Sequence, residues 1–193
     1  IEGKLAAVIC VEDPLREEAA DAVRELKEAG ITKVVMMTGD SERTAAAIAK
    51  RVGVDEYYSE VLPEDKASFV EKEKELGNKV IMIGDGINDS LALSSASVGI
   101  AISDGAAIAR EIADVTISAD NLHEIVTLKR LSTTLMKRIH NNYRTIIGVN
   151  GGLIALGVAG VIMPTTSALL HNLSTLTISL RSMRNYLPKE EEL

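Results

Sequence analysis

Two carboxylates, Asp85 and Asp89, follow an apolar run in the segment K-V-I-M-I-G-D-G-I-N-D-S at residues 79–90. Residues 80–83 lack the alternation of a half-exposed strand, which predicts a parallel strand buried on both faces. Residues after such a strand lie at the carboxyl edge of the sheet, where open α/β folds bind ligands. Because Mg²⁺ binds through one or two carboxylates plus phosphate and water, the pair indicates a magnesium site beside a phosphoryl group. The alternative is that these residues, with Asn88, only cap the next helix.

A second polar group, Thr38, Gly39 and Asp40, follows the apolar run 33–37. The Thr38 hydroxyl and the N–H groups of the following helix start could donate to a phosphoryl oxygen at the same sheet edge. Lys66, in the sequence P-E-D-K, could bring a positive charge to the same group. A helix start with solvated charges explains either segment alone. Their order before G-D-G-I-N-D favours one shared phosphoryl site.

Polar residues also lie within a long uncharged span near the end of the chain. Those with donor atoms suited to a metal ion are Asn150, His171, Ser174 and Thr175. The last three share one face of a helix because they are three and four residues apart. A neutral imidazole with neighbouring hydroxyls suits a transition-metal ion. The alternative is that the amide and hydroxyl groups only form hydrogen bonds between helices.

The elements that position these residues form an alternating pattern of apolar β-rich runs and helical segments. The expected strands are 5–11, 33–37, 57–58, 80–83, 98–102 and 115–118, and the expected helices are 14–29, 42–52, a charged helix reaching Leu76, 91–94 and 106–113. Pro14 suits a first helical turn, and Gly30 suits the end of that helix. This order predicts an α/β fold, a Rossmann-like parallel sheet with flanking helices.

The span from Thr145 to Leu180 contains no charged side chain and is divided at Met163 and Pro164. Each part approaches the ~20 apolar residues that cross a bilayer, so we expect a transmembrane hairpin with helices at about 145–162 and 165–183. A hydrophobic hairpin buried in a soluble protein is the alternative. The positive-inside rule places the α/β domain and the C-terminus in the cytosol, because basic residues flank both ends of the hairpin: Arg144, Arg181, Arg184 and Lys189. The expected domains are 1–125, an α/β domain, and 126–193, a linker helix, two membrane helices and a cytosolic tail.

Composition sets further limits on function. The formal net charge is −7, and the basic residues have no interleaved aromatics, which argues against nucleic acid as a partner. The single cysteine, Cys10, cannot form an internal disulfide and is compatible with a reducing, cytosol-facing environment. Ile1 stands almost directly before a strand, which predicts that the chain is a piece of a longer polypeptide.

The three motifs T-G-D, P-E-D-K and G-D-G-I-N-D together resemble those of P-type cation-transporting ATPases, whose phosphorylation domain has the haloacid dehalogenase fold. The D-P-L-R stretch at 13–16 also resembles that family, and the resemblance covers essentially the whole chain. The short hairpin close to the C-terminus is similar to the heavy-metal branch. The resemblance implies part of an ATP-driven heavy-metal pump, with Mg²⁺ and ATP as cofactors. The implied partners are a transported transition-metal ion, the lipid bilayer and the remaining domains of the pump.

The resemblance also implies roles for individual residues. It places Asp85 and Asp89 at Mg²⁺, and it assigns catalysis to Thr38, Gly39, Asp40, Lys66, Asn88 and Asp89, of which Thr38, Asp40 and Lys66 also bind the nucleotide or its phosphoryl group. It makes Asn150, His171, Ser174 and Thr175 candidates for the transported ion. The sequence H-N-L-S-T at 171–175 stands where copper pumps carry a Met and two serines and zinc pumps carry an Asp, so the metal stays open.

One departure from the family is decisive for activity. The sequence contains no D-K-T-G-T, the segment with the aspartate that becomes phosphorylated, so we predict that this chain alone has no ATPase cycle. Two other interpretations remain: a stand-alone phosphatase of the haloacid dehalogenase superfamily, or a non-catalytic membrane-anchored module. Phosphate release from a generic ester would favour the phosphatase, and absence of Mg²⁺ binding would favour the module.

Overall fold

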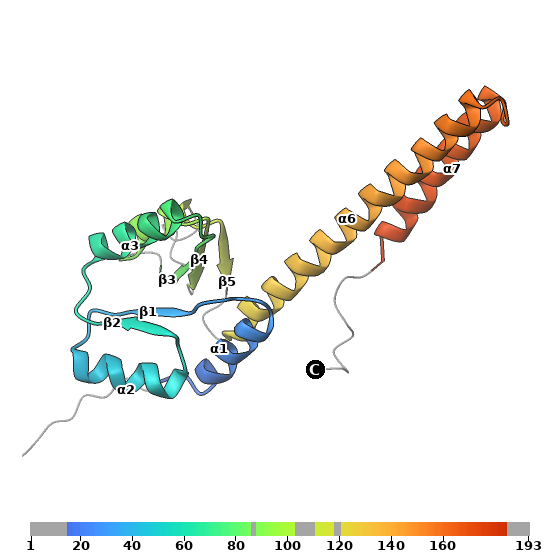
Figure 1. The fold of residues 1–193 in the computed structure, drawn as a ribbon. Coiled ribbons are helices and arrows are strands. Elements are labelled where there is room, and N and C mark those ends of the chain that lie inside the picture. Colours follow the sequence, from blue (N-terminus) through green and yellow to red (C-terminus); the bar gives the residue numbers. More distant parts are fainter. Residues whose placement is uncertain (1–14, 86–87, 103–110, 118–120, 185–193) are drawn as a thin grey trace, which may run out of the picture. The chain divides into compact units, whose positions relative to one another are not determined.

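The computed structural model describes residues 15–85, 88–102, 111–117 and 121–184. Their elements, in chain order, are α1 (Ala19–Glu28), β1 (Val35–Met37), α2 (Glu42–Val52), β2 (Glu56–Tyr58), α3 (Pro63–Glu75), β3 (Ile81–Gly84), α4 (Ser90–Ser95), β4 (Val98–Ile102), β5 (Val115–Ile117), α6 (His123–Val158) and α7 (Pro164–Ser182) (Figure 1). The chain divides into two compact units, Ile1–Val126 and Thr127–Leu193. Several expected segments lie wholly or partly outside the described residues: strand 5–11, the first two residues of the D-P-L-R stretch, most of helix 106–113 and the tail from 185.

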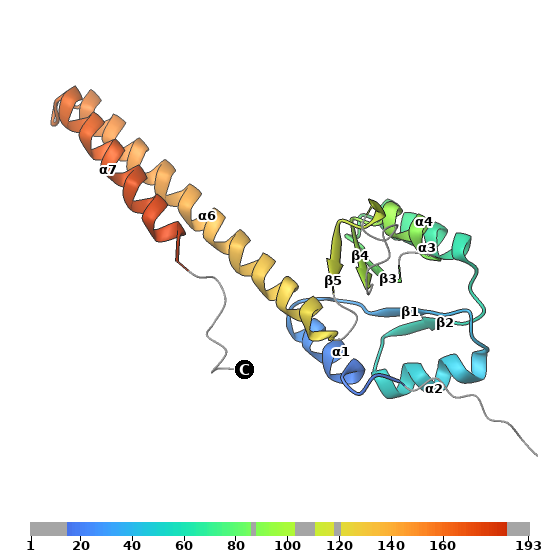
Figure 2. The ribbon, with the colours of Figure 1, turned by 180° about the vertical axis from the view of Figure 1, so that it is seen from behind.

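All strand pairs in the first unit are parallel, as the sequence predicts. One sheet has the order β1-β2, with Val35 opposite Glu56, and the other has the order β3-β4-β5, with Ile81 opposite Val98. The two sheets are visible from both sides of the molecule (Figures 1 and 2). Among the described residues no hydrogen-bonded ladder joins β1 to β3, and the expected strand 5–11 lies outside them, so a single sheet stays a prediction.

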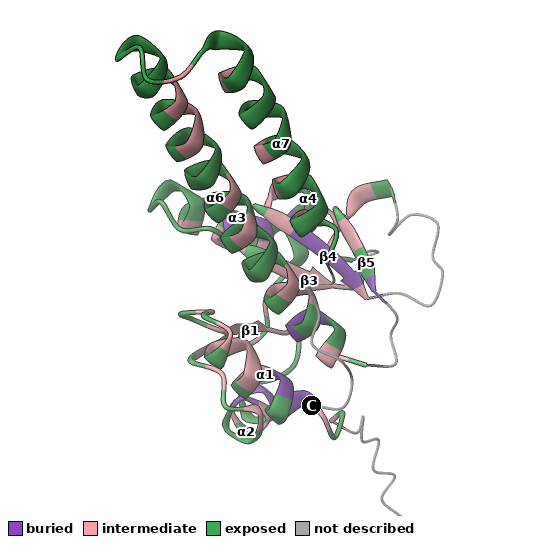
Figure 3. Cartoon of the chain, turned by 90° about the vertical axis from the view of Figure 1, so that its right-hand side faces the viewer, coloured by how far each residue is buried: buried purple, intermediate pink, exposed green. Residues whose placement is uncertain are grey.

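The sequence predicted that the strand before Asp85 is buried on both faces, and this prediction is wrong for β3. Ile81 is 39% exposed and the rest of β3 is half-buried, because among the described residues β3 pairs only with β4 and forms the edge of its sheet. The buried strand is its neighbour β4, whose Gly99, Ile100 and Ala101 are covered (Figure 3). The apolar composition of the strand that precedes Asp85 therefore does not by itself predict its exposure.

Local signals fix the helices around the sheets. α1 ends just before Gly30, whose φ of +95° is a left-handed conformation that glycine adopts without strain. α3 begins with Pro63 in its first turn, and the Leu62 N–H donates to Asp65 Oδ2 over 3.2 Å. α3 then packs against α4 through a small buried cluster of Ala67, Val70 and Ala92. This packing places Lys66, one residue before Ala67, close to the start of α4.

The second unit contains a helical hairpin. α6 is one continuous helix of 36 residues that no proline interrupts, so the expected linker helix and the first helix of the hairpin form a single helix. Pro164 begins α7, at the division expected from the sequence. Half-buried side chains recur at spacings of four and seven, which defines a seam of Arg138, Asn142, Val149 and Leu153 on α6 and Ser167, Ser174, Ile178 and Ser182 on α7. The remaining surface of both helices is mostly exposed (Figure 3).

Candidate functional site

Thr38 and Asp40 form one hydrogen-bonded group directly after β1. The Thr38 N–H donates to Tyr58 O over 3.0 Å and the Thr38 carbonyl accepts from the Val61 N–H over 3.0 Å, so β2 and the residues after it fix the backbone. The Thr38 hydroxyl donates to Asp40 Oδ2 over 2.9 Å, and the Asp40 N–H donates to Thr38 Oγ1 over 3.1 Å. The hydroxyl proton expected to reach a phosphoryl oxygen is therefore bound by Asp40, and Gly39 is exposed between them.

Lys66 and Asp89 meet in an ion pair between the start of α3 and the residue that precedes α4. Lys66 Nζ lies 2.7 Å from Asp89 Oδ1, and the side chains are only 16% and 12% exposed. Water and salt screen such a pair less than one on the surface. The sequence predicted both residues at one site, but it gave no sign of a direct contact, because they are separated by 23 positions.

Gly84, the last residue of β3, lies against the Asp89 side chain. A Cβ at Gly84 would lie 2.5 Å from Asp89 Oδ2 and 2.7 Å from Asp89 Cβ. Non-bonded atoms this close would clash. Glycine therefore lets the carboxylate lie against the end of the strand. The Leu93 N–H donates to the Asp89 carbonyl over 2.8 Å, so the same residue also starts α4.

Asp85 follows β3 directly and is exposed. The Asn88 N–H donates to Asp85 Oδ1 over 3.2 Å, and Asn88 Nδ2 donates to Asp85 Oδ2 over 3.4 Å. No three His, Cys, Asp or Glu side chains within the described ranges gather closely enough to hold a metal ion. Mg²⁺ needs no such set, because it keeps several waters and takes one or two carboxylates plus phosphate oxygens. The oxygens of Asp85 and Asp89 therefore fit magnesium shared with a phosphoryl group.

The predicted residues thus form three groups: Thr38 with Asp40, Lys66 with Asp89, and Asp85 with Asn88. In the part of the chain that the structure describes, no hydrogen bond or ion pair joins the first group to the second. The structure thus brings the members of each group together within hydrogen-bond or ion-pair distance.

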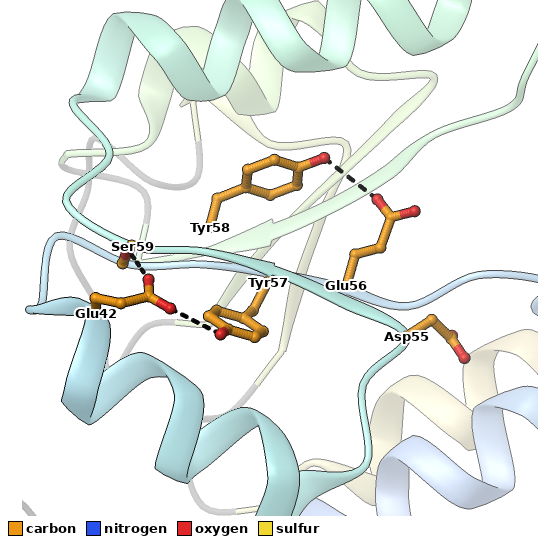
Figure 4. A pocket seen from close by; sticks show the side chains of 6 residues that line it. All are labelled: Glu42, Asp55, Glu56, Tyr57, Tyr58 and Ser59. Carbon is orange, nitrogen blue, oxygen red and sulfur yellow. Dashed lines mark hydrogen bonds between the residues drawn. The ribbon is translucent and has the colours of Figure 1, made fainter.

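Sequence reasoning missed a pocket beside β2. It is lined by Glu42, Asp55, Glu56, Tyr57, Tyr58 and Ser59 (Figure 4). The Ser59 hydroxyl donates to Glu42 Oε2 over 2.6 Å and the Tyr57 hydroxyl donates to Glu42 Oε1 over 2.8 Å. These donors, Ser59 first, hold the pKa of the Glu42 carboxyl below its ordinary value. Tyr57 in β2 and Ser59 directly after it are two positions apart, and this spacing in an extended segment could have revealed the group.

The other two carboxylates of the pocket carry lysine partners. Lys33 Nζ lies 2.9 Å from Glu56 Oε2, and this hydrogen bond raises the pKa of Lys33. Lys27 Nζ lies 2.7 Å from Asp55 Oδ1, and the Lys27 hydrogen bond, helped by one from the Val34 N–H, lowers the pKa of Asp55. Each carboxylate of the pocket is therefore already matched by donors of the same unit.

The structure brings the predicted polar residues of the hairpin together around His171. Its Nδ1 lies 2.8 Å from Asn150 Oδ1 on α6. The Ser174 and Thr175 hydroxyls donate to the His171 carbonyl over 2.8 Å and 3.1 Å. Among the described residues we find no helix whose length and apolar character together would let it traverse a bilayer.

The amino-acid sequence is similar to those of known proteins. A family profile described as haloacid dehalogenase-like hydrolase matches residues 1–97. A zinc-exporting P-type ATPase of Mycobacterium marinum is 37% identical over 185 residues, covering 95% of this chain and 25% of the relative. Copper-transporting ATPase 2 of Rhizobium meliloti is 44% identical over 170 residues, covering 88% of this chain and 20% of the relative. The chain thus spans about a quarter of the length of the curated relatives that it matches.

A solved structure is also similar. The crystal structure of a zinc-transporting PIB-type ATPase in its E2·Pi state matches with a TM-score of 0.81 and 32% sequence identity. The match covers 90% of this chain and 28% of that chain. The likeness therefore extends over both the α/β part and the helical part of the sequence.

Proposed function

The chain belongs to the haloacid dehalogenase-like hydrolase family, and from that premise we propose that it supplies the phosphoryl-handling half-site of an ATP-driven heavy-metal pump. The observation that carries the proposal is the Lys66–Asp89 ion pair, which lies against Gly84 and next to the exposed Asp85. A positive charge and two carboxylates at one strand end form a site for a phosphoryl group and a magnesium ion. The match to P-type ATPases over 95% of the chain supports this assignment.

Each residue of the half-site has its own role in this proposal. Asp85, which is exposed, would hold Mg²⁺, whose charge when bound offsets that of the phosphoryl oxygens. Lys66 offers a positive charge to the same oxygens, and Asp89 fixes the position of its Nζ through the 2.7 Å contact. Asn88 Nδ2 and the Thr38 hydroxyl supply hydrogen-bond donors once they leave their present carboxylate partners.

The loop after β1 has a separate role in the proposal. Asp40 binds the Thr38 proton and so holds that hydroxyl away from other acceptors. Approach of a nucleotide phosphate to the N–H groups at the start of α2 would compete for Thr38, because those groups attract anions. Asp40 and Gly39 would thus line the nucleotide side of the site, as the resemblance implies.

We propose further that α6 and α7 form a membrane hairpin with both ends in the cytosol. Residues 145–180 carry no charge, and large apolar side chains along both helices are exposed in the structure, among them Ile147, Ile154, Val158, Leu169, Leu173 and Leu176. A contiguous apolar surface of this kind needs cover from lipid or protein. The remaining domains of the pump and the bilayer would supply it.

The cargo in this proposal is a transition-metal ion. The relatives that match are named as exporters of zinc and transporters of copper. Polar groups inside a membrane helix are costly and often functional, which makes the cluster of Asn150, His171, Ser174 and Thr175 the place for the cargo.

A chimera tests the proposal. This chain would replace the matching segment of the Mycobacterium marinum relative, and zinc-stimulated ATP hydrolysis would be measured for the chimera and for its Asp85→Asn variant. We expect the chimera to hydrolyse ATP and the variant to lose at least about 100-fold of that rate, because one electrostatic partner of a phosphoryl group is removed. Equal rates in two variants that fold equally well would contradict the proposal.

A second experiment uses the 193-residue chain itself. Amide resonances of residues 84–90 would be followed by NMR during a Mg²⁺ titration. We expect saturable shifts in the wild type and none in Asp85→Asn, and saturable shifts in both would show that Asp85 is not the ligand.

A further inference from the structure

The contact between His171 and Asn150 joins the two helices of the hairpin. His171 Nδ1 on α7 and Asn150 Oδ1 on α6 are 2.8 Å apart. Asn150 is half-buried and follows Val149, a seam residue of α6. The imidazole is therefore held from the opposite helix by a single amide oxygen.

This contact determines which nitrogen of the imidazole carries the proton. An amide oxygen has no proton and can only accept, so His171 Nδ1 must donate. In a neutral imidazole the other nitrogen then keeps its lone pair. His171 Nε2 is thus the ring atom left to bind a ligand.

The neighbouring hydroxyls are oriented in the same way. Ser174 Oγ and Thr175 Oγ1 both direct their protons to the His171 carbonyl, over 2.8 Å and 3.1 Å. Their oxygens keep lone pairs, because each proton is already bound. One imidazole nitrogen and hydroxyl oxygens are donors that suit divalent zinc, cobalt or manganese, whereas Cu(I) prefers thiolate and thioether sulfur.

We propose that Asn150 is a positioning residue and not a metal ligand: it holds His171 in the Nδ1–H tautomer, so that His171 Nε2 binds a divalent transition-metal ion. The inference rests on the proposed function, since it gives the cargo site of the pump a ligand atom. Residues that accept a hydrogen bond from the second nitrogen of a metal-binding histidine fix its orientation and raise its basicity.

The chain contains a matched control for a purely structural role. Asn142, also on α6, donates from Nδ2 to Ser182 Oγ on α7 over 2.7 Å. It bridges the same two helices without contacting a histidine. Asn142→Ala therefore removes an interhelical bond and leaves the His171 tautomer unchanged.

The first experiment reads the tautomer directly. The full chain, labelled with ¹⁵N at histidine and held in detergent micelles at alkaline pH, would be recorded by long-range ¹H–¹⁵N correlation NMR. We expect the Nδ1–H pattern for His171 in the wild type, Asn142→Ala and Asn150→Asp, and its loss in Asn150→Ala. His140 serves as an internal reference, because its Nδ1 faces the Met136 carbonyl over 2.8 Å and must also donate. An Nε2–H pattern for His171 in the wild type would overturn the inference.

The second experiment measures the dissociation constants of Zn²⁺ and Co²⁺ for the same variants. We expect His171→Ala to abolish binding, Asn150→Ala to weaken it about 10–100-fold and Asn150→Asp to restore it. Equal weakening by Asn142→Ala and Asn150→Ala, or undiminished binding in His171→Ala, would overturn the inference. The Mg²⁺ titration tests the proposed phosphoryl site at Asp85 independently of the hairpin. A failure of the His171 inference can therefore be distinguished from a failure of the proposed function.

Discussion

Lys66 Nζ lies 2.7 Å from Asp89 Oδ1, and each side chain is less than one-fifth exposed. The pair joins the first turn of α3 to the residue that starts α4, the two helices that pack on the cluster of Ala67, Val70 and Ala92. A residue expected to act on a phosphoryl group is therefore also part of the structure that holds the site. This double role yields the first prediction.

Lys66→Met and Asp89→Asn should each lower the free energy of unfolding by about 1–3 kcal/mol, because each leaves one partner half-buried and unpaired. The double variant should lose less than the sum of the two, as residues in contact are coupled. Urea unfolding of the full chain measures all three. Arg24→Ala is the control: its partner Asp21 is 56% exposed, so the loss should stay below about 1 kcal/mol. Simple additivity would contradict a direct coupling.

Gly84→Ala should destabilise the chain by about 1–3 kcal/mol and displace Asp89, because the new Cβ has no room beside that carboxylate. Gly148→Ala, in α6, should be neutral or stabilising, since no atom lies within 4 Å of its Cβ position and alanine favours the helix. Thermal unfolding compares the two variants. Equal changes in thermal stability would mean that the nearby Asp89 side chain does not exclude a larger residue at position 84.

The Glu42 carboxyl should make stability depend on pH. Its pKa is lowered in the folded chain by Ser59 and Tyr57, so its contribution is present above the ordinary carboxyl pKa and is lost as the pH falls through the lowered value. The stability difference between the wild type and Glu42→Gln should therefore shrink as the pH drops below about 4. Urea unfolding across this range measures it. Ser59→Ala should reduce the effect, and a difference independent of pH would contradict it.

Arg138→Ala should loosen the end of α7. The Arg138 guanidinium donates to the Ser182 carbonyl over 3.2 Å and to the Arg184 carbonyl over 2.6 Å, groups that the end of a helix leaves without partners. Amide hydrogen exchange at residues 178–184 should become roughly 10-fold faster, which corresponds to the ~1.4 kcal/mol of a charged hydrogen bond. Arg144→Ala, an exposed arginine of the same helix, should leave these amides unchanged.

The chain incubated with labelled ATP and Mg²⁺ should form no acyl-phosphate. The reason lies in the sequence, which contains no D-K-T-G-T segment. Acid gel electrophoresis followed by hydroxylamine treatment makes the measurement. A labelled band sensitive to hydroxylamine would refute the prediction and would identify a nucleophile elsewhere in the chain.

Local signals explain what the sequence predicted well. Val98–Ile102 is a strand with the expected bounds, a new helix begins at Pro164 where the sequence divides the uncharged span, and Gly30 follows the end of α1. Each of these depends on the conformational preferences of a few adjacent residues. The T-G-D and G-D-G-I-N-D motifs resemble those of one family, and the family match over residues 1–97 agrees with that resemblance.

Contacts between distant residues explain what the sequence could not give. The Lys66–Asp89 pair and the Glu42–Tyr57 bond depend on how helices pack on strands, which no local pattern encodes. The partial exposure of Ile81 in β3 depends on which segments cover the strand, and its apolar sequence does not encode this. The sequence identified Lys66 and Asp89 but not their contact, and it did not identify Glu42 and Tyr57 as a polar group.

The hydroxyl groups of α7 have a consequence for how the hairpin can move. Ser174, Thr175, Thr177 and Ser182 all donate to carbonyls of their own helix, three or four residues back. These bonds stay intact whatever α7 does relative to α6. In the described hairpin, Arg138, Asn142 and Asn150 on α6 form hydrogen bonds with α7 or the residues directly after it. A small axial shift of α7 would therefore exchange the hydrogen bonds between the helices, while every one of these hydroxyl protons keeps its acceptor.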